Sequence, residues 1–141
     1  MNRGVTLPEL LVALVLIGLL ACIGVPRIAA VRNGILVREE ALHLLAALDQ
    51  ARGAAIRIGS NTRLTLADSG YSLVATAADS QVVLWRAPGP AGNAVQLSGA
   101  GAPLLFGPAG LAVGASNRTL LLRRGSVTRT VVISRLGRIS G

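Results

Sequence analysis

The feature that most constrains this chain is an apolar run close to its start. Residues 10–25 are sixteen positions without a charge or a strongly polar side chain. Extending the run back to residue 5 gives twenty-one positions, interrupted by Thr6, Pro8 and Glu9. About 20 apolar residues cross a bilayer as a helix. The sequence therefore predicts a transmembrane helix over residues 5–25, and its 141 residues leave room for a single folded domain beyond it.

Two other interpretations compete for the same run. A cleaved secretory signal would have only residues 1–4 as its charged region and a carboxylate at the head of its apolar core. The segment Leu19-Leu20-Ala21-Cys22 resembles a lipoprotein cleavage box. The residues after Cys22 stay apolar and then become helical, whereas a lipidated cysteine is usually followed by a flexible polar tether. We therefore favour the membrane-spanning helix.

Glu9 is the most informative residue in the run. A carboxylate inside an apolar segment costs several kcal/mol unless it is paired, so it indicates a function. Thr6 and Glu9 also form a capping-box pattern, in which Thr6 caps the helix and Glu9 reaches back from the third helical position. Pro8 suits the first turn, where its missing N–H is not needed. Both interpretations, assembly and capping, stay open from the sequence.

Residues 3–9 followed by the apolar run resemble the type IV prepilin signal. The resemblance implies that residues 1–4 are a leader peptide, which a prepilin peptidase removes by cutting between Gly4 and Val5. The same enzyme then methylates the new N-terminus at Val5, where the family usually has phenylalanine. Glu9 takes the family's position for the acid that neutralises the amine of a neighbouring subunit during assembly.

The arginines that flank the run are unevenly distributed between its two ends. Only Arg3 precedes it, whereas Arg27, Arg32 and Arg38 follow it. The positive-inside rule alone would place the C-terminal side in the cytoplasm. We give the leader motif more weight, so we expect a single-pass protein of the bacterial inner membrane whose C-terminal domain is periplasmic.

A second helical pattern follows the run. Small or apolar residues recur at alternating spacings of four and three, which is typical of one stripe along a helix. Pro26 is expected to end or kink the membrane helix, and several glycines favour local bends. Residues 26–58 are therefore predicted to be an amphipathic continuation. Leu42 and Leu45 are expected to widen the stripe, and His43 is assigned no role. The stripe residues are Val37, Ala41, Leu44, Leu48, Ala51, Ala55 and Ile58.

Beyond residue 59 the pattern changes to short strands separated by turns. Loops are expected at 87–93, 107–110 and 114–117, and Gly125-Ser126 suits a two-residue hairpin turn. We predict an α+β fold in which residues 59–141 form an antiparallel β-sheet domain packed on the helix. The predicted strands are 62–67, 71–76, 82–86, 95–98, 104–106, 118–124, 127–134 and 135–139.

Composition argues against an enzyme. The single Cys22 and single His43 exclude an intrachain disulfide and a zinc site of Cys and His ligands, so no metal and no cofactor are predicted. A hydrolase built on Asp68, Asp79 or the Glu39–Glu40 pair is disfavoured, because adjacent glutamates on a helix point apart and nothing supplies a matched second group.

The positive charge is concentrated in the C-terminal half. Residues 27–79 carry six arginines and five acids, whereas residues 80–141 carry seven arginines and no acid. Such a surface suits an anionic partner. Arginines 123, 124 and 129 flank the hairpin turn as a basic tip that arginines 135 and 138 are expected to extend. The candidate DNA-binding residues are Arg123, Arg124, Arg129, Arg135 and Arg138.

Further segments resemble the GspH/FimT branch of pilin-like proteins, namely residues 48–52 with 55–56, 106–111, 120–122 and 131–138. The resemblance implies a pilin-like fold and two hypotheses. The first is a minor pseudopilin of a type II protein secretion system, whose partners are the prepilin peptidase, other major and minor pseudopilins and an inner-membrane assembly platform. The alternative is a FimT-type minor pilin that contacts DNA during natural transformation. Some FimT-type members bind DNA through a C-terminal Gly-Arg-x-Arg motif, whose second arginine is Ser140 here.

Overall fold

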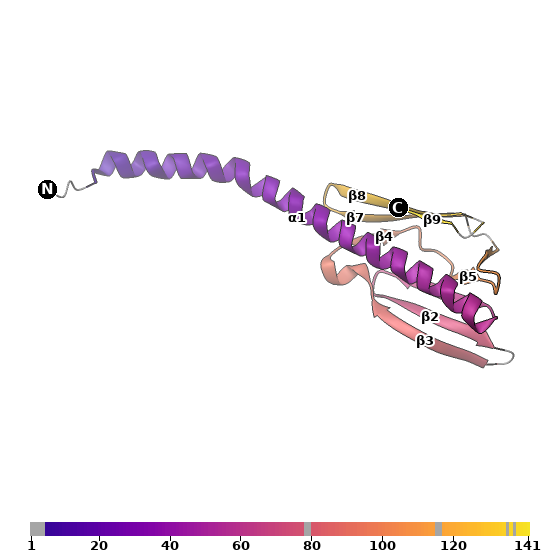
Figure 1. The fold of residues 1–141 in the computed structure, drawn as a ribbon. Coiled ribbons are helices and arrows are strands. Elements are labelled where there is room, and N and C mark those ends of the chain that lie inside the picture. Colours follow the sequence, from indigo (N-terminus) through magenta and orange to yellow (C-terminus); the bar gives the residue numbers. More distant parts are fainter. Residues whose placement is uncertain (1–4, 78–79, 115–116, 135, 137) are drawn as a thin grey trace.

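A computed structural model describes residues 5–77, 80–114, 117–134, 136 and 138–141. The chain forms one long helix followed by two antiparallel sheets, which lie against the second half of the helix (Figure 1). The first half of the helix extends away from the sheets. The predicted leader 1–4 with Gly4, the candidate acid Asp79 and the candidate DNA-binding Arg135 lie outside the described residues.

The helix α1 runs without interruption over Leu7–Ile58. Of the two outcomes expected at Pro26, an end or a kink, the end is not found, because the helix continues through this residue. Its axis does change direction between the free and the packed part (Figure 1), as expected where proline removes a backbone hydrogen bond. Gly59 ends the helix with φ +67°, and its N–H donates to the Ala55 carbonyl at 3.0 Å.

The strands fall into a five-stranded sheet of order β3-β2-β1-β5-β6 and a four-stranded sheet of order β4-β7-β8-β9. The single sheet expected from the sequence is therefore divided in two. The elements are β1 (Thr62–Ala67), β2 (Gly70–Ala77), β3 (Ser80–Pro88), the 3-10 helix η1 (Pro90–Asn93), β4 (Gln96–Ser98), β5 (Leu104–Phe106), β6 (Ala112–Val113), β7 (Arg118–Arg124), β8 (Val127–Ile133) and β9 (Ile139–Ser140).

The chain crosses between the sheets after β4. β4 pairs with β7, and the next strand, β5, pairs with β1 in the other sheet. Gly99 enables this crossing with φ +84°, and a Cβ there would lie 2.3 Å from the Thr119 carbonyl oxygen. A close approach of this kind depends on tertiary contacts, so strand periodicity in the sequence did not reveal it.

Two local expectations are corrected, and one further strand is found. The predicted strand 135–139 is the shorter β9, which pairs with the end of β8. The loop predicted at 87–93 contains the end of β3 and η1. β6, which was not predicted, pairs with β5 across the Gly107–Gly110 turn. The hairpin at Gly125-Ser126 is confirmed, because Arg124 faces Val127 in the register of β7 and β8.

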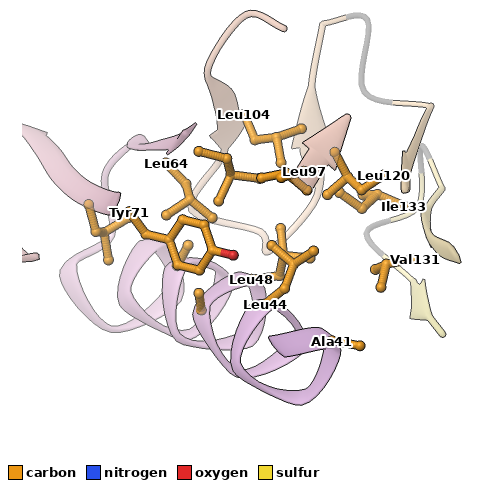
Figure 2. Packing of buried hydrophobic residues seen from close by; sticks show 14 of the residues in the cluster. Ala41, Leu44, Leu48, Leu64, Tyr71, Leu97, Leu104, Leu120, Val131 and Ile133 are labelled. Carbon is orange, nitrogen blue, oxygen red and sulfur yellow. The ribbon is translucent and has the colours of Figure 1, made fainter. Parts of the chain in front are cut away.

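The core lies between the second half of α1 and both sheets (Figure 2). Six of the seven predicted stripe residues of α1 are buried, but Ile58 is 46% exposed. Leu42 does not widen the stripe, because it is 57% exposed, whereas Leu45 packs against the core. The largest fully buried side chains contributed by the sheets are Leu64, Leu73, Phe106, Leu120, Leu122 and Ile133.

Candidate assembly site

The apolar side chains of the first half of α1 are left largely exposed by the rest of the described residues. No residue between positions 7 and 36 is buried. Its leucines, valines and isoleucines are 54% to 75% exposed, apart from the half-buried Leu36. This part of α1 is long and apolar enough to cross a membrane. In water such a surface would drive association, so it requires lipid or other apolar helices around it.

Glu9 closes the capping box at the start of this surface. Its Oε2 accepts a hydrogen bond from the Thr6 N–H at 3.1 Å and another from the Thr6 hydroxyl at 3.0 Å. The capping interpretation of Glu9 is therefore realised in the structure. Because both bonds end on Oε2, the second oxygen, Oε1, takes no part in this cap. Val5, at the predicted cleavage point, is 74% exposed.

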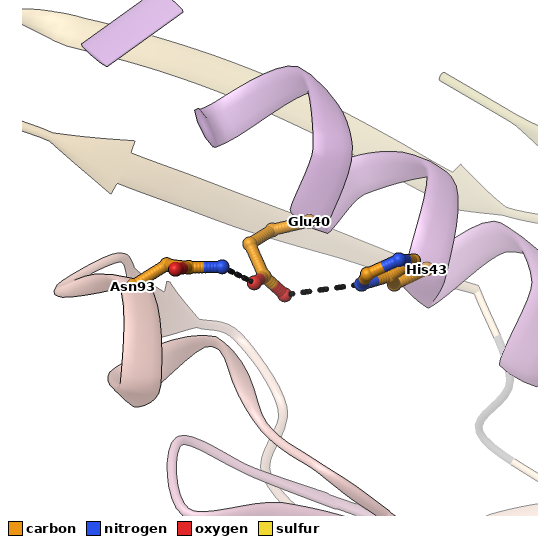
Figure 3. A network of polar contacts seen from close by, with 3 residues as sticks. All are labelled: Glu40, His43 and Asn93. Atoms are coloured by element: carbon orange, nitrogen blue, oxygen red, sulfur yellow. Dashed lines mark hydrogen bonds and ion pairs between the residues drawn. The ribbon is translucent and has the colours of Figure 1, made fainter. Parts of the chain in front are cut away.

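A second glutamate of α1, Glu40, behaves in the opposite way. It is 4% exposed, and its Oε1 accepts a hydrogen bond of 2.7 Å from the Asn93 side chain in η1 (Figure 3). His43 Nδ1 lies 3.9 Å from Oε2, and that imidazole is largely exposed. Glu40 thus ties η1 to the helix. This contact could not be predicted from local patterns, because the two residues are 53 positions apart.

The other acids considered for catalysis have structural contacts or lie apart. An oxygen of Asp68 accepts the Leu97 N–H at 2.7 Å and so links the β1–β2 turn to β4. Glu39 is exposed, on a different face of α1 from Glu40. Within the described residues, no group of three or more His, Cys, Asp or Glu side chains gathers to hold a metal ion.

The basic tip lies beside the helix. Arg124 Nε donates to the Asn33 side-chain oxygen at 2.9 Å, although 91 positions separate the two residues. A Cβ on Gly125, which has φ +57°, would lie 3.0 Å from Asn33 Nδ2. Arg123 is exposed, and its Nε donates to the Gly125 carbonyl at 3.1 Å. The turn between β7 and β8 therefore lies against α1 at the end of the domain nearest the free half of the helix (Figure 1).

Of the other candidate arginines, the structure describes Arg129, which lies in β8 opposite Leu122, and Arg138, which follows that strand. Arg129 lines a cavity of about 300 Å³ together with Arg38 of α1. Arg138 lies beyond the far end of β8, where its N–H donates to the Ser134 side chain at 3.1 Å. The expectation that Arg138 extends the tip is therefore wrong, because β8 runs the length of the sheet between the turn and Arg138.

An exposed apolar helix half with a capped acid at its start, joined to an antiparallel β-domain, defines a membrane-anchored protein of the pilin-like class. The model of the family described as type II transport protein GspH matches residues 40–137, and that of the prokaryotic N-terminal methylation motif matches residues 1–22. The chain therefore belongs to the GspH family. The family and the fold are those of structural pilins.

Solved structures support the fold. The chain is similar to the type IV minor pilin FimU of Pseudomonas aeruginosa in one crystal form, with a TM-score of 0.61 and 22% identity over 74% of this chain and 86% of FimU. A second crystal form of FimU gives a TM-score of 0.58 and 22% identity over 73% of this chain and 90% of FimU. No curated protein matches the chain.

Proposed function

We propose that this chain is a minor pseudopilin of a type II protein secretion system. It is inserted in the bacterial inner membrane with its β-domain in the periplasm. It then joins a short periplasmic pseudopilus that drives protein export across the outer membrane. The observation that carries the proposal is the apolar surface of residues 7–36, whose apolar side chains the other described residues leave largely exposed. Membership of the GspH family supports the choice of machine.

Processing precedes assembly in this proposal. Prepilin peptidase cuts after Gly4, whose missing side chain suits an extended segment in a protease cleft. The freed amine of Val5 is a cation, and methylation keeps it one. The assembly platform in the inner membrane then moves the mature chain from lipid into the filament, where apolar helix halves of other pseudopilins take the place of lipid.

Glu9 has two tasks in this account. Its Oε2 closes the helix cap with Thr6, and its negative charge compensates the Val5 amine of a neighbouring subunit in the apolar filament. An uncompensated charge in such an environment costs several kcal/mol. The pairing therefore favours a chain that is docked in register over one that is free in the membrane.

Processing is tested by Gly4→Val, which we expect to leave an uncleaved protein in the membrane. Gly18→Val is the matched control, because a Cβ at Gly18 meets nothing within 4 Å and the residue is distant from the cut. Mass spectrometry of the native protein should find a methylated Val5 at the mature N-terminus. A mature chain that begins at a lipidated Cys22 would instead establish the lipoprotein interpretation.

A second candidate function is a minor pilin of a type IV pilus, as in the FimT type that contacts DNA during transformation. The observation that favours it is the likeness to the type IV minor pilin FimU. A deletion strain separates the two candidates. Loss of exported proteins with intact pili supports the secretion machine, whereas loss of pili or of transformation with intact export supports the pilus.

A further inference from the structure

Four arginines lie close to the predicted membrane segment. Arg27 and Arg32 follow the predicted membrane segment on α1, and both are exposed. The turn between β7 and β8 brings Arg123 and Arg124 to the same part of the helix through the contact of Arg124 with Asn33. We call these four residues the membrane-proximal arginines. Residues 10–32 contain no acid, and residues 80–141 contain none either.

Their height above the membrane follows from helix geometry. If the apolar core ends near Val25, Arg27 and Arg32 lie roughly 3 and 10 Å beyond it, and Asn33 roughly 12 Å, at about 1.5 Å per residue. The headgroup layer adds roughly 5–8 Å to each side of the hydrocarbon core. The Debye length at physiological ionic strength is about 8 Å. All four arginines are therefore within electrostatic reach of the headgroups.

The positions of these four arginines suit a planar partner. The four arginines come from one helix and from a hairpin turn that leans on it, so they lie along one short stretch of α1, roughly 9 Å from Arg27 to Asn33. A bilayer surface that the helix crosses surrounds this stretch at one level. The arginines can therefore contact it without sharing one face of the domain. The hydrogen bond between Arg124 and Asn33 holds the turn at this level.

We propose that the membrane-proximal arginines dock the β-domain on anionic phospholipid headgroups before the chain enters a filament. Arginine pairs readily with phosphate, and basic residues next to a membrane segment are attracted to an anionic surface. This contact gives a role to the positive charge that follows the membrane segment, which the positive-inside rule does not explain for a periplasmic domain. The proposal rests on the membrane-spanning placement of residues 5–25.

The test uses the full mature chain in vesicles of phosphatidylcholine, with or without phosphatidylglycerol, that contain a lipid with a fluorescence quencher on its headgroup. A dye is placed on the exposed turn through Ser126→Cys in a Cys22→Ala background. We expect stronger quenching in the vesicles with phosphatidylglycerol and its loss at high salt. Equal quenching in both kinds of vesicle would overturn the proposal.

Two double variants distinguish a contact made by these arginines from a general effect of the positive charge of the domain. Arg27→Gln with Arg123→Gln should lower the equilibrium constant for docking about fivefold per arginine. Arg57→Gln with Arg63→Gln removes the same charge from exposed positions at the far end of α1 and in β1, and should leave quenching unchanged. An equal loss in both pairs would contradict a localised contact. A dye that responds to added duplex DNA but not to phosphatidylglycerol would overturn the lipid assignment in favour of nucleic acid.

Whether residues 5–25 span the membrane is measured separately. In the unmodified chain, Cys22 lies within the predicted span and should be protected from a water-soluble thiol reagent in the same vesicles. Reaction of Cys22 would contradict the span. Protection of Cys22 together with an unquenched turn would overturn only the docking proposal.

Discussion

Over residues 7–36 the helix α1 leaves its leucines, valines and isoleucines largely exposed, whereas over residues 37–58 it buries one stripe of them against two sheets. The residue types are similar, but their surroundings differ. The second half has sheets with matching apolar faces, and the first half has none in the chain. The comparison indicates that the second half stabilises the domain and that the first half contributes only where lipid or other helices cover it.

The two glutamates of these halves show the same contrast. Glu9 is exposed, and within the described residues its Oε2 closes the cap with Thr6, so its second oxygen is proposed to serve an external partner. Glu40 is buried and bonded to Asn93 of η1. A carboxylate in the packed half is thus used for folding, and the one in the free half is proposed for assembly.

The largest expected effect comes from shortening a leucine in the packed half. Leu48→Ala should lower the free energy of unfolding by about 2–5 kcal/mol, because Leu48 is fully buried and its removal leaves a cavity. Leu16→Ala, at a residue that is 55% exposed, is the matched control. Denaturant unfolding of the full chain in detergent, followed by Trp85 fluorescence, measures both. Similar losses of unfolding free energy in the two variants would contradict the proposed difference between the two halves of α1.

A smaller effect is expected at the contact between η1 and the helix. Asn93→Ala leaves the buried carboxylate of Glu40 without its amide donor and should cost about 1–3 kcal/mol. Asn117→Ala, at an exposed position before β7, serves as the control. The same unfolding measurement applies. An Asn93→Ala variant as stable as the parent would mean that Glu40 does not depend on η1.

The smallest effect concerns Tyr71, whose ring belongs to the buried core cluster (Figure 2). Its buried hydroxyl has no hydrogen-bond partner within the described part of the chain. Tyr71→Phe should therefore change the free energy of unfolding by less than about 1 kcal/mol at neutral pH.

Tyr71 is also expected to make the free energy of unfolding depend on pH. Burial raises the pKa of the Tyr71 phenol above its ordinary value, and the nearby charges of Glu40 and Asp68 add to the shift. A pKa that is raised on folding contributes stability below the unfolded pKa of about 10, and this stability is lost as the pH rises through the folded value. Tyr71→Phe should remove this part of the alkaline loss. An unchanged pH profile above about 10 would contradict it.

Local patterns in the sequence predicted much of this fold. Six of the seven residues that the alternating spacing placed on the stripe are buried. The spacing is informative because a helix that packs on a sheet must repeat its apolar side chains every turn. The strands 62–67, 104–106 and 118–124 have the predicted bounds. The capping box was visible because both of its residues lie in one turn.

Contacts between distant segments could not be predicted in the same way. The burial of Glu40 depends on Asn93, and the position of the basic tip depends on the contact of Arg124 with Asn33. Neither pair leaves a periodic signal. The split into two sheets likewise depends on β4 pairing with β7, a choice of partner that strand propensity does not determine.

The most direct test of the account is the recovery of a Glu9→Gln variant in sheared filaments or in crosslinks to partner pilins. Glutamine keeps an oxygen that accepts the Thr6 N–H, so the capping box survives. It lacks the charge that compensates a neighbour's Val5 amine. We expect a variant that is inserted, cleaved and as stable as the parent, yet absent from filaments. Normal recovery and normal function would show that Glu9 only starts the helix.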